Sequence, residues 1–236
     1  MAILVDERID ELGNEYESET AENVLRWALN RFGDRVALAT SFGAEDVVVT
    51  DILLKVNPEA KIFTLDTGRL PEETYKVWEE IEKKYGTKIK PYSPDTSSLE
   101  GMIIEHGPNP FYSSVELRRL CCKIRKVDPL HRALSELDAW TTGLRREQSV
   151  TRAEIKKIEH DKANDIVKLN PITDWTEKQV WDYIKKNDVP YNALHDKNYP
   201  SIGCAPCTRA IEPGEDVRAG RWWWEDPDKK ECGLHK

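Results

Sequence analysis

The order of helical and extended segments in the first 92 residues most constrains the fold. Apolar residues in Ala21–Phe32 recur with the helical period, and Thr20 and Gly33 suit the two ends of that helix. A short buried strand is predicted at Val36–Thr40, and a second helix over about 46–56. Helix and strand therefore alternate from the start of the chain.

The following segments repeat this alternation. A second strand is predicted at Lys61–Leu65, Pro71 suits the first turn of a third helix, and a weaker strand lies near Ile89. Such an order predicts an α/β fold, with helices on both faces of a mostly parallel sheet. Further predicted elements are helices over 113–126, from Asp128–Pro129 and after Thr176, and strands at 139–142 and 166–169.

The composition limits the domain number and the class of partner. The chain has 236 residues, and no second core is visible, so we expect one α/β domain over 1–212 and a mobile, loop-rich C-terminal tail over 213–236. A formal net charge of −8 argues against a general nucleic-acid binder. No apolar run is long enough to span a membrane, and no secretory signal is visible, so a cytoplasmic location is expected.

The segment from Ser41 to Asp46 joins a predicted strand to a predicted helix. Backbone N–H groups at such a helix N-terminus attract phosphate, and Gly43 lets a ligand approach closely. The next strand ends in a similar turn, so both turns are expected at the carboxyl edge of the sheet. An ordinary strand-to-helix turn is the alternative to a nucleotide pocket. The second turn consists of Leu65, Asp66, Thr67 and Gly68.

The first of these turns resembles the Ser-Gly-Gly-x-Asp-Ser pyrophosphate loop of the adenine-nucleotide α-hydrolase-like group. It departs from that loop at Phe42 and at Glu45-Asp46. The departure argues against ATP-cleaving chemistry and favours a loop that binds the monophosphate end of a nucleotide.

Four of the five cysteines form two close pairs, which is the inventory of a metal or iron–sulfur site. Buried thiols that act as small apolar residues are the alternative. The adjacent pair does not match the usual spacing of a structural zinc site, which favours a [4Fe–4S] cluster and leaves zinc open. The pairs are Cys121 with Cys122, and Cys204 with Cys207.

Basic residues gather near these cysteines. A run around the first pair lines an anion site or forms a solvated basic helix face. Other arginines follow in loops, and arginine suits bidentate recognition of phosphate or sulfate, so we expect a small, multiply anionic ligand. The run comprises Arg118, Arg119, Lys123, Arg125 and Lys126; the loop arginines are Arg145, Arg146, Arg152, Arg209, Arg218 and Arg221.

Cys232 lies near the end of the sequence, apart from the two pairs. Lys229, Lys230 and His235 are close in sequence, and such groups lower a thiol pKa and favour the thiolate nucleophile. An idle exposed thiol is the alternative.

These motifs together resemble the assimilatory adenylyl-sulfate (APS) reductases of the APS/PAPS reductase family, where PAPS is 3′-phosphoadenylyl sulfate. The resemblance covers about 36–235. It rests on Ser-Phe-Gly-Ala-Glu-Asp from Ser41, Leu-Asp-Thr-Gly from Leu65, Cys-Cys-x-x-Arg-Lys from Cys121, Gly-Leu-Arg-Arg-Glu-Gln-Ser from Gly143, Tyr-Pro-Ser-Ile-Gly-Cys-x-x-Cys-Thr from Tyr199, Gly-Arg-Trp from Gly220 and Glu-Cys-Gly-Leu-His from Glu231.

The resemblance implies an oxidoreductase of sulfate assimilation and cysteine biosynthesis. Cys121, Cys122, Cys204 and Cys207 would hold a [4Fe–4S] cluster, whose presence points to APS, with PAPS or dual APS/PAPS use as the alternative. Cys232 would attack the sulfur of APS, releasing AMP and forming an S-sulfonate. Thioredoxin or a related dithiol protein would then release sulfite. The oligomeric state, a homo-oligomer included, stays open.

The resemblance also assigns substrate contacts. The adenosine end would lie against Ser41, Phe42, Gly43, Leu65, Asp66, Thr67 and Gly68. The phosphate and sulfate groups would contact Lys126, Arg152, Arg218 and Arg221.

Two rival functions remain at this point. An ATP-dependent adenylating or thiolating enzyme would release pyrophosphate from ATP. A non-enzymatic iron–sulfur sensor or zinc-stabilised interaction module would give Cys232 no role, so its function in the cell would survive Cys232→Ser.

Overall fold

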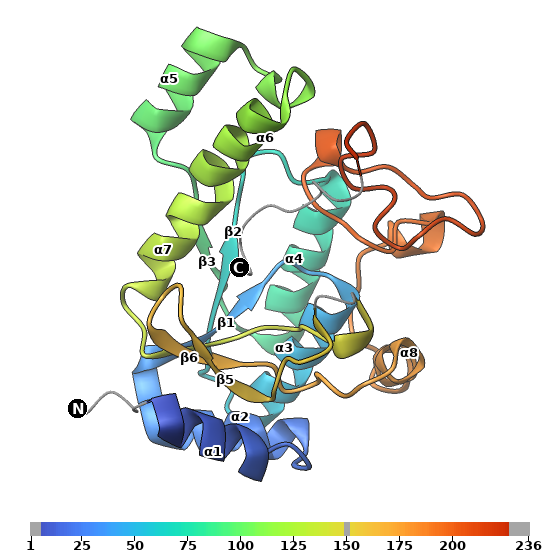
Figure 1. The fold of residues 1–236 in the computed structure, drawn as a ribbon. Coiled ribbons are helices and arrows are strands. Elements are labelled where there is room, and N and C mark those ends of the chain that lie inside the picture. The colour runs from blue at the N-terminus through green and yellow to red at the C-terminus, as the bar shows by residue number, and fades with distance from the viewer. Residues whose placement is uncertain (1–5, 149–151, 227–236) are drawn as a thin grey trace. The chain divides into compact units, whose positions relative to one another are not determined.

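The chain, seen in a computed structural model, builds a six-stranded sheet with the order β3-β2-β1-β4-β6-β5 (Figure 1). The structure describes residues 6–148 and 152–226. The strands are β1 (Val36–Thr40), β2 (Lys61–Leu65), β3 (Lys90–Tyr92), β4 (Ala139–Thr141), β5 (Ile158–Asp161) and β6 (Ile166–Leu169). The α-helices are α1 (Asp6–Glu15), α2 (Ala21–Phe32), α3 (Ala44–Val56), α4 (Glu72–Tyr85), α5 (Thr96–His106), α6 (Val115–Cys122), α7 (Asp128–Leu134) and α8 (Glu177–Lys186).

Local capping signals set the ends of the best-predicted helices. The Thr20 side chain accepts a hydrogen bond from the Asn23 N–H at the start of α2, and Gly33 ends that helix with a φ of 54°. The predicted capping box at α8 is present, with Thr176 and Gln179 bonding reciprocally. These predictions and the bounds of β1 and β2 are confirmed.

Other predicted bounds are corrected. The helix predicted over 46–56 begins at Ala44, because Gly43 takes the N-cap position. The helix predicted over 113–126 is capped by Ser114, and its α-helical part ends at Cys122.

A π-helical turn, Lys123–Val127, follows directly after the cysteine pair. π-Helical turns concentrate at functional sites because the wider turn re-aims side chains.

Three elements gave weak sequence signals. The strand β5 has only four residues and two of them are charged, while α5 buries only Met102 of its described side chains. The helix α1 is short and polar on average, and its Ile9 is buried. Short elements with few buried apolar residues lack a readable period.

The sheet centre is parallel. Val36 of β1 lies opposite Ala139 of β4, and β4 pairs with β6 in the same direction. Only β5 runs antiparallel among the described pairings, against β6. The predicted fold class, a mostly parallel sheet with helices, is confirmed.

The chain divides into two compact units. The first consists of Met1–Phe63, Trp78–Lys90 and Leu134–Tyr191. Its core packs α1 and α2 against the sheet, with these buried residues: Ile9, Val24, Ala28, Phe32, Val36, Ala139, Ile158, Val167 and Leu169.

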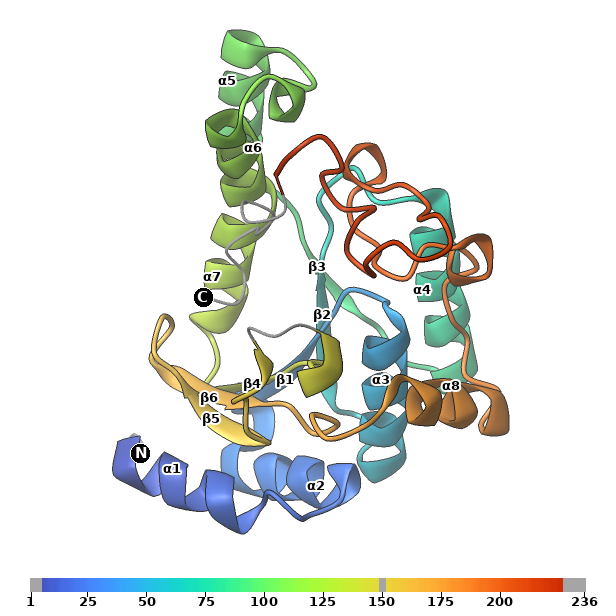
Figure 2. The same cartoon turned by 45° about the vertical axis from the view of Figure 1, so that its right-hand side comes forward.

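The second unit consists of Thr64–Val77, Pro91–Ala133 and Asn192–Lys236. Within it, α6 and α7 follow one another along one line in both views (Figure 2). Its apolar cluster includes Met102, Phe111, Ile124, Trp222 and three cysteines. No helix among residues 6–148 and 152–226 is long and apolar enough to cross a membrane.

Candidate functional site

The two cysteine pairs line one cavity in the second unit. Cys121 and Cys122 end α6, while Cys204 and Cys207 lie at the two ends of a tight turn. The cavity is partly open, and the space in and around it that is free of protein atoms is about 380 Å³, open solvent included. Its other lining side chains are Arg69, Phe111, Arg118, Arg125, Lys126, Pro206, Arg221 and Trp222.

Polar contacts tie the turn after β2 to these cysteines. The Thr67 hydroxyl lies 3.3 Å from the Cys204 sulfur, and Arg125 Nη1 donates to the Thr67 carbonyl at 2.6 Å. The Ala205 N–H donates to the Arg69 carbonyl at 2.8 Å. Both cysteine pairs are therefore joined through residues of one turn.

Burial disfavours thiolates in the cavity. It raises the pKa of Cys121, and burial together with neighbouring sulfurs raises the pKa of Cys207 to about 12. A metal would supply the positive charge that four thiolates need there.

The cavity also contains buried donors with unused hydrogen-bonding capacity. Trp222 Nε1 and Arg125 Nε have no hydrogen-bond acceptor within the described part of the chain. Such donors are costly unless an acceptor is present, and a thiolate or sulfide can serve. In the same described ranges, no three His, Cys, Asp or Glu side chains converge on one metal ion.

The basic run after Ser114 contains both buried and exposed side chains. Arg118 is fully buried, forms an ion pair with Glu225 at 2.7 Å and lies over the Trp222 ring. Arg125 is 5% exposed. A solvated basic face is therefore wrong for these two arginines and holds for Lys123, which is 62% exposed at its side chain.

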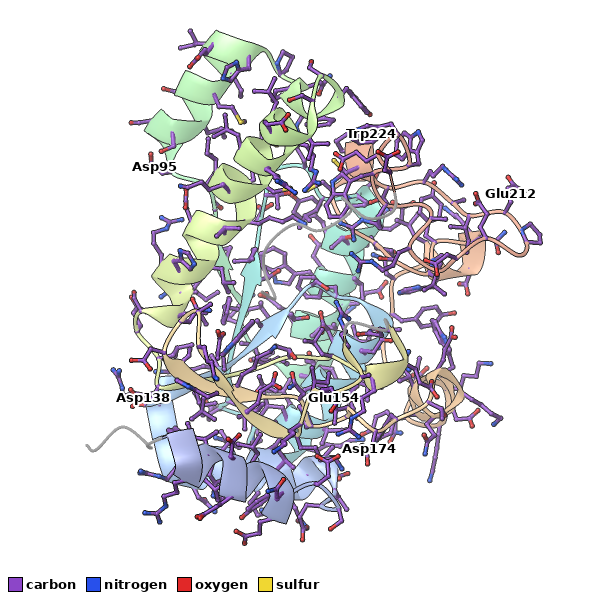
Figure 3. All side chains as sticks on the ribbon, viewed as in Figure 1. Asp95, Asp138, Glu154, Asp174, Glu212 and Trp224 are labelled. Atoms are coloured by element: carbon purple, nitrogen blue, oxygen red, sulfur yellow. The ribbon has the colours of Figure 1, made fainter. Side chains whose placement is uncertain are left out.

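Aromatic residues pack beside this ion pair. Trp224, labelled in Figure 3, packs against Phe111 and Tyr112, with ring centroids 6.2 and 4.6 Å away. The Tyr112 hydroxyl donates to the Pro206 carbonyl at 2.9 Å. These contacts hold the segment that follows Trp222 to the second unit.

The predicted anion contacts fall in different places. Lys126 and Arg221 line the cysteine cavity, and Arg221 also lies over the Trp222 ring. Gly203 permits this packing, because a Cβ there would lie 2.4 Å from Arg221 Nη2.

The other two predicted contacts, Arg218 and Arg152, are not among the residues that line the cavity. Arg218 is half-buried in the second unit, and Arg152 belongs to the first unit.

The loop after β1 is closed by Asp46. The Ser41 N–H and hydroxyl both donate to Asp46 Oδ2, at 2.6 and 2.7 Å, and the Gly143 N–H donates to the same carboxylate. A Cβ on Gly143 would lie 2.5 Å from Asp46 Oδ1. The ends of β1 and β4 are thereby joined.

Phe42 is held inside the protein. Its φ is 60°, a left-handed conformation that costs energy for a bulky residue. The ring is 1% exposed and stacks on Trp78 with centroids 5.6 Å apart. Burial of the ring stabilises the strained loop, so Phe42 shapes it from within.

The second predicted turn is also rigid. The Asp66 carboxylate accepts from the Gly68 N–H at 2.9 Å and from the Tyr75 hydroxyl at 2.7 Å. Gly68 has a φ of 66°, and Leu65 is half-buried at the end of β2.

Burial raises the pKa of Asp46 from its ordinary 3.8 to about 6. A raised folded-state pKa gives stability that is complete below the ordinary value and is lost as the pH rises through about 6. Asp46→Asn has no charge to bury, so its stability relative to wild type should improve by about 1 kcal/mol between pH 5 and 7.5. Urea unfolding at both pH values measures this.

Asp182→Asn on α8 is the matched control, because Asp182 pairs at the surface with Lys178. Its stability relative to wild type should not change between the two pH values. An equal effect of Asp46→Asn at both would contradict the account of Asp46.

Two further arginines after β4 are engaged with protein groups. Arg145 is 5% exposed and pairs with Glu45 at 2.8 Å and with Glu147 at 3.2 Å. Arg146 pairs with Glu17 and donates to the Ile155 carbonyl at 2.9 Å.

The predicted nucleophile, Cys232, lies outside the described residues.

Comparison with known proteins decides the family. A family model described as the phosphoadenosine phosphosulfate reductase domain matches residues 35–210. The chain therefore belongs to the phosphoadenosine phosphosulfate reductase family. An adenosine 5′-phosphosulfate reductase of Allochromatium vinosum is 55% identical over 203 residues, which cover 86% of this chain and 79% of that relative.

Solved structures agree with this family and its fold. A phosphoadenylyl-sulfate reductase from Candida auris, solved as a phosphate complex, is 30% identical with a TM-score of 0.76, covering 88% of this chain and 98% of that one. An FMN adenylyltransferase from Candida glabrata shares the fold, with a TM-score of 0.57 at 14% identity, and covers 98% of this chain and 86% of that one. The predicted family and the adenine-nucleotide α-hydrolase-like fold are confirmed.

Proposed function

We propose that this chain reduces adenylyl sulfate to sulfite and AMP with electrons from a dithiol protein, in assimilatory sulfate reduction. The observation that carries the proposal is the cavity lined by four cysteines together with Lys126 and Arg221. Membership of a reductase family, with a curated relative named adenosine 5′-phosphosulfate reductase, supports the same reaction.

The cavity fits a [4Fe–4S] cluster held by Cys121, Cys122, Cys204 and Cys207. Four thiols line the same cavity, and buried donors beside them lack acceptors within the described ranges. When bound, the cluster supplies structural and electrostatic support, since both chemical steps are two-electron thiol reactions.

The proposed first step transfers a sulfonate to Cys232. Its thiolate attacks the sulfur of APS, the bond from that sulfur to the bridging oxygen breaks, and AMP leaves with the oxygen. Lys126 and Arg221, with Arg218 and Arg152, would stabilise charge on the phosphosulfate and on departing AMP.

The second step needs two external thiols, which we assign to thioredoxin or a relative. One thiolate attacks the Cys232 sulfur and releases sulfite, and the second thiol resolves the mixed disulfide. The dithiol is oxidised to a disulfide and Cys232 returns to the thiol. This chemistry requires a reducing compartment, so we propose a cytoplasmic location.

The ion pairs of two arginines after β4 favour APS over PAPS as the substrate. PAPS carries an additional 3′-phosphate, which calls for a further cation near the ribose. Arg145 and Arg146, the two arginines closest in sequence to the end of β4, are engaged with Glu45, Glu147 and Glu17. We expect kcat/KM for APS to exceed that for PAPS by at least about tenfold, because the 3′-phosphate of PAPS would lack one good charged contact, which is worth about that factor.

Sulfite release by anaerobically purified protein, with reduced thioredoxin and each substrate in turn, measures the preference. Equal values would establish the dual-specificity alternative, and a higher value for PAPS would refute the assignment. Pyrophosphate release from ATP would instead support the adenylating alternative.

A further inference from the structure

The donors of the loop after β1 are already bonded to an anion. A helix N-terminus stabilises negative charge and commonly holds a phosphate. At α3 the negative charge is the carboxylate of Asp46, which accepts from the N–H and hydroxyl of Ser41 and from the Gly143 N–H. The protein's own carboxylate therefore occupies the place of an external anion.

The surroundings hold this carboxylate in place. Gly143 approaches it so closely that a Cβ would overlap Asp46 Oδ1. The stacking of Phe42 on Trp78 fixes the loop between Ser41 and the helix. A phosphate that displaced the carboxylate would break three hydrogen bonds and leave a charge without partners, which is costly in a half-buried position.

Neighbouring charges offer an incoming phosphate little attraction. The first turn of α3 carries a second carboxylate, Glu45. Two guanidinium nitrogens of Arg145, Nε and Nη2, donate to one oxygen of the Glu45 carboxylate, at 3.0 and 2.8 Å. The third nitrogen, Nη1, donates to another carboxylate, that of Glu147.

We infer that Asp46 is a specificity-determining residue that keeps phosphate away from the start of α3. The loop then holds the uncharged nucleoside part of a ligand, and nucleotides that would place a phosphate at this helix, such as ATP, bind poorly. Inorganic pyrophosphate is rejected for the same reason. The inference rests on the proposed function, because it assumes that an adenine nucleotide lies against this loop.

Calorimetric titration of the full-length protein with AMP, ATP and inorganic pyrophosphate tests the inference without turnover. Wild type should bind ATP at least about tenfold more weakly than AMP, since one unfavourable charge at a helix N-terminus is worth about that factor. Asp46→Asn and Asp46→Ser should lower the ATP-to-AMP ratio of dissociation constants about tenfold. They should also tighten pyrophosphate binding. Asp182→Asn, which removes one surface charge from α8, should leave the ratio unchanged.

An unchanged ratio in both Asp46 variants, or wild-type protein that binds ATP as tightly as AMP, would overturn the inference. Sulfite release from APS by wild type, measured separately, tests the proposed function. A protein that releases sulfite but shows an unchanged ratio keeps the function and loses the role of Asp46. A wild type that binds no AMP contradicts both.

Discussion

Serine in place of any one of the four cavity cysteines is expected to leave the purified protein with little iron. A serine oxygen is a poor ligand for iron that prefers thiolate, and the three remaining thiols are held in a buried cavity. Sulfite release from APS should fall at least about 100-fold. This loss exceeds what is usual when a residue that only hydrogen-bonds to a metal ligand is replaced. The variants are Cys121→Ser, Cys122→Ser, Cys204→Ser and Cys207→Ser.

Iron analysis and visible absorption after anaerobic purification measure this effect. Wild type should carry about four irons per chain, the content of one cluster. Cys232→Ser is the matched control and should keep the full iron content. About one zinc and no iron in wild type would contradict the cluster, as would iron retained by all four variants.

Replacing Cys232 with serine is expected to abolish sulfite release while leaving the cluster and AMP binding intact. A serine hydroxyl is a far weaker nucleophile near neutral pH, so turnover should fall at least about 1000-fold. The cavity cysteines, Lys126 and Arg221 are unchanged in this variant, so the dissociation constant for AMP should change less than about twofold.

Thioredoxin-coupled sulfite assays and AMP titration measure the two halves of this prediction. Sulfite released by Cys232→Ser at the wild-type rate would remove Cys232 from the mechanism. Equal loss of AMP binding and turnover would indicate a structural role for the residue.

Helices and strands with strong local signals could be predicted from the sequence. Thr20 and Gly33 define the ends of α2 through contacts within four residues, and such contacts need no tertiary information. The π-helical turn after Cys122 carries no comparable signal. The bounds of β5 were also unpredictable, because its pairing with β6 determines them.

The cysteine cavity was accessible to sequence reasoning because thiols in close pairs have few other uses. The role of Asp46 was not, since it depends on β1 and β4 being neighbours, and their residues lie about 100 positions apart. The Arg118–Glu225 ion pair spans 107 positions, so the burial of Arg118 could not be predicted from local sequence. Long-range pairing therefore decided which charged residues are available to a ligand.

Intact-mass spectrometry of wild-type protein incubated with APS and no reductant tests the central claim most directly. Covalent catalysis by Cys232 requires that an S-sulfonate form and persist until a thiol arrives. The account predicts a mass gain of about 80 Da, one sulfonate, located on Cys232 and lost with sulfite release when reduced thioredoxin is added. A protein that releases AMP with no such adduct, or carries it on another cysteine, would contradict the account.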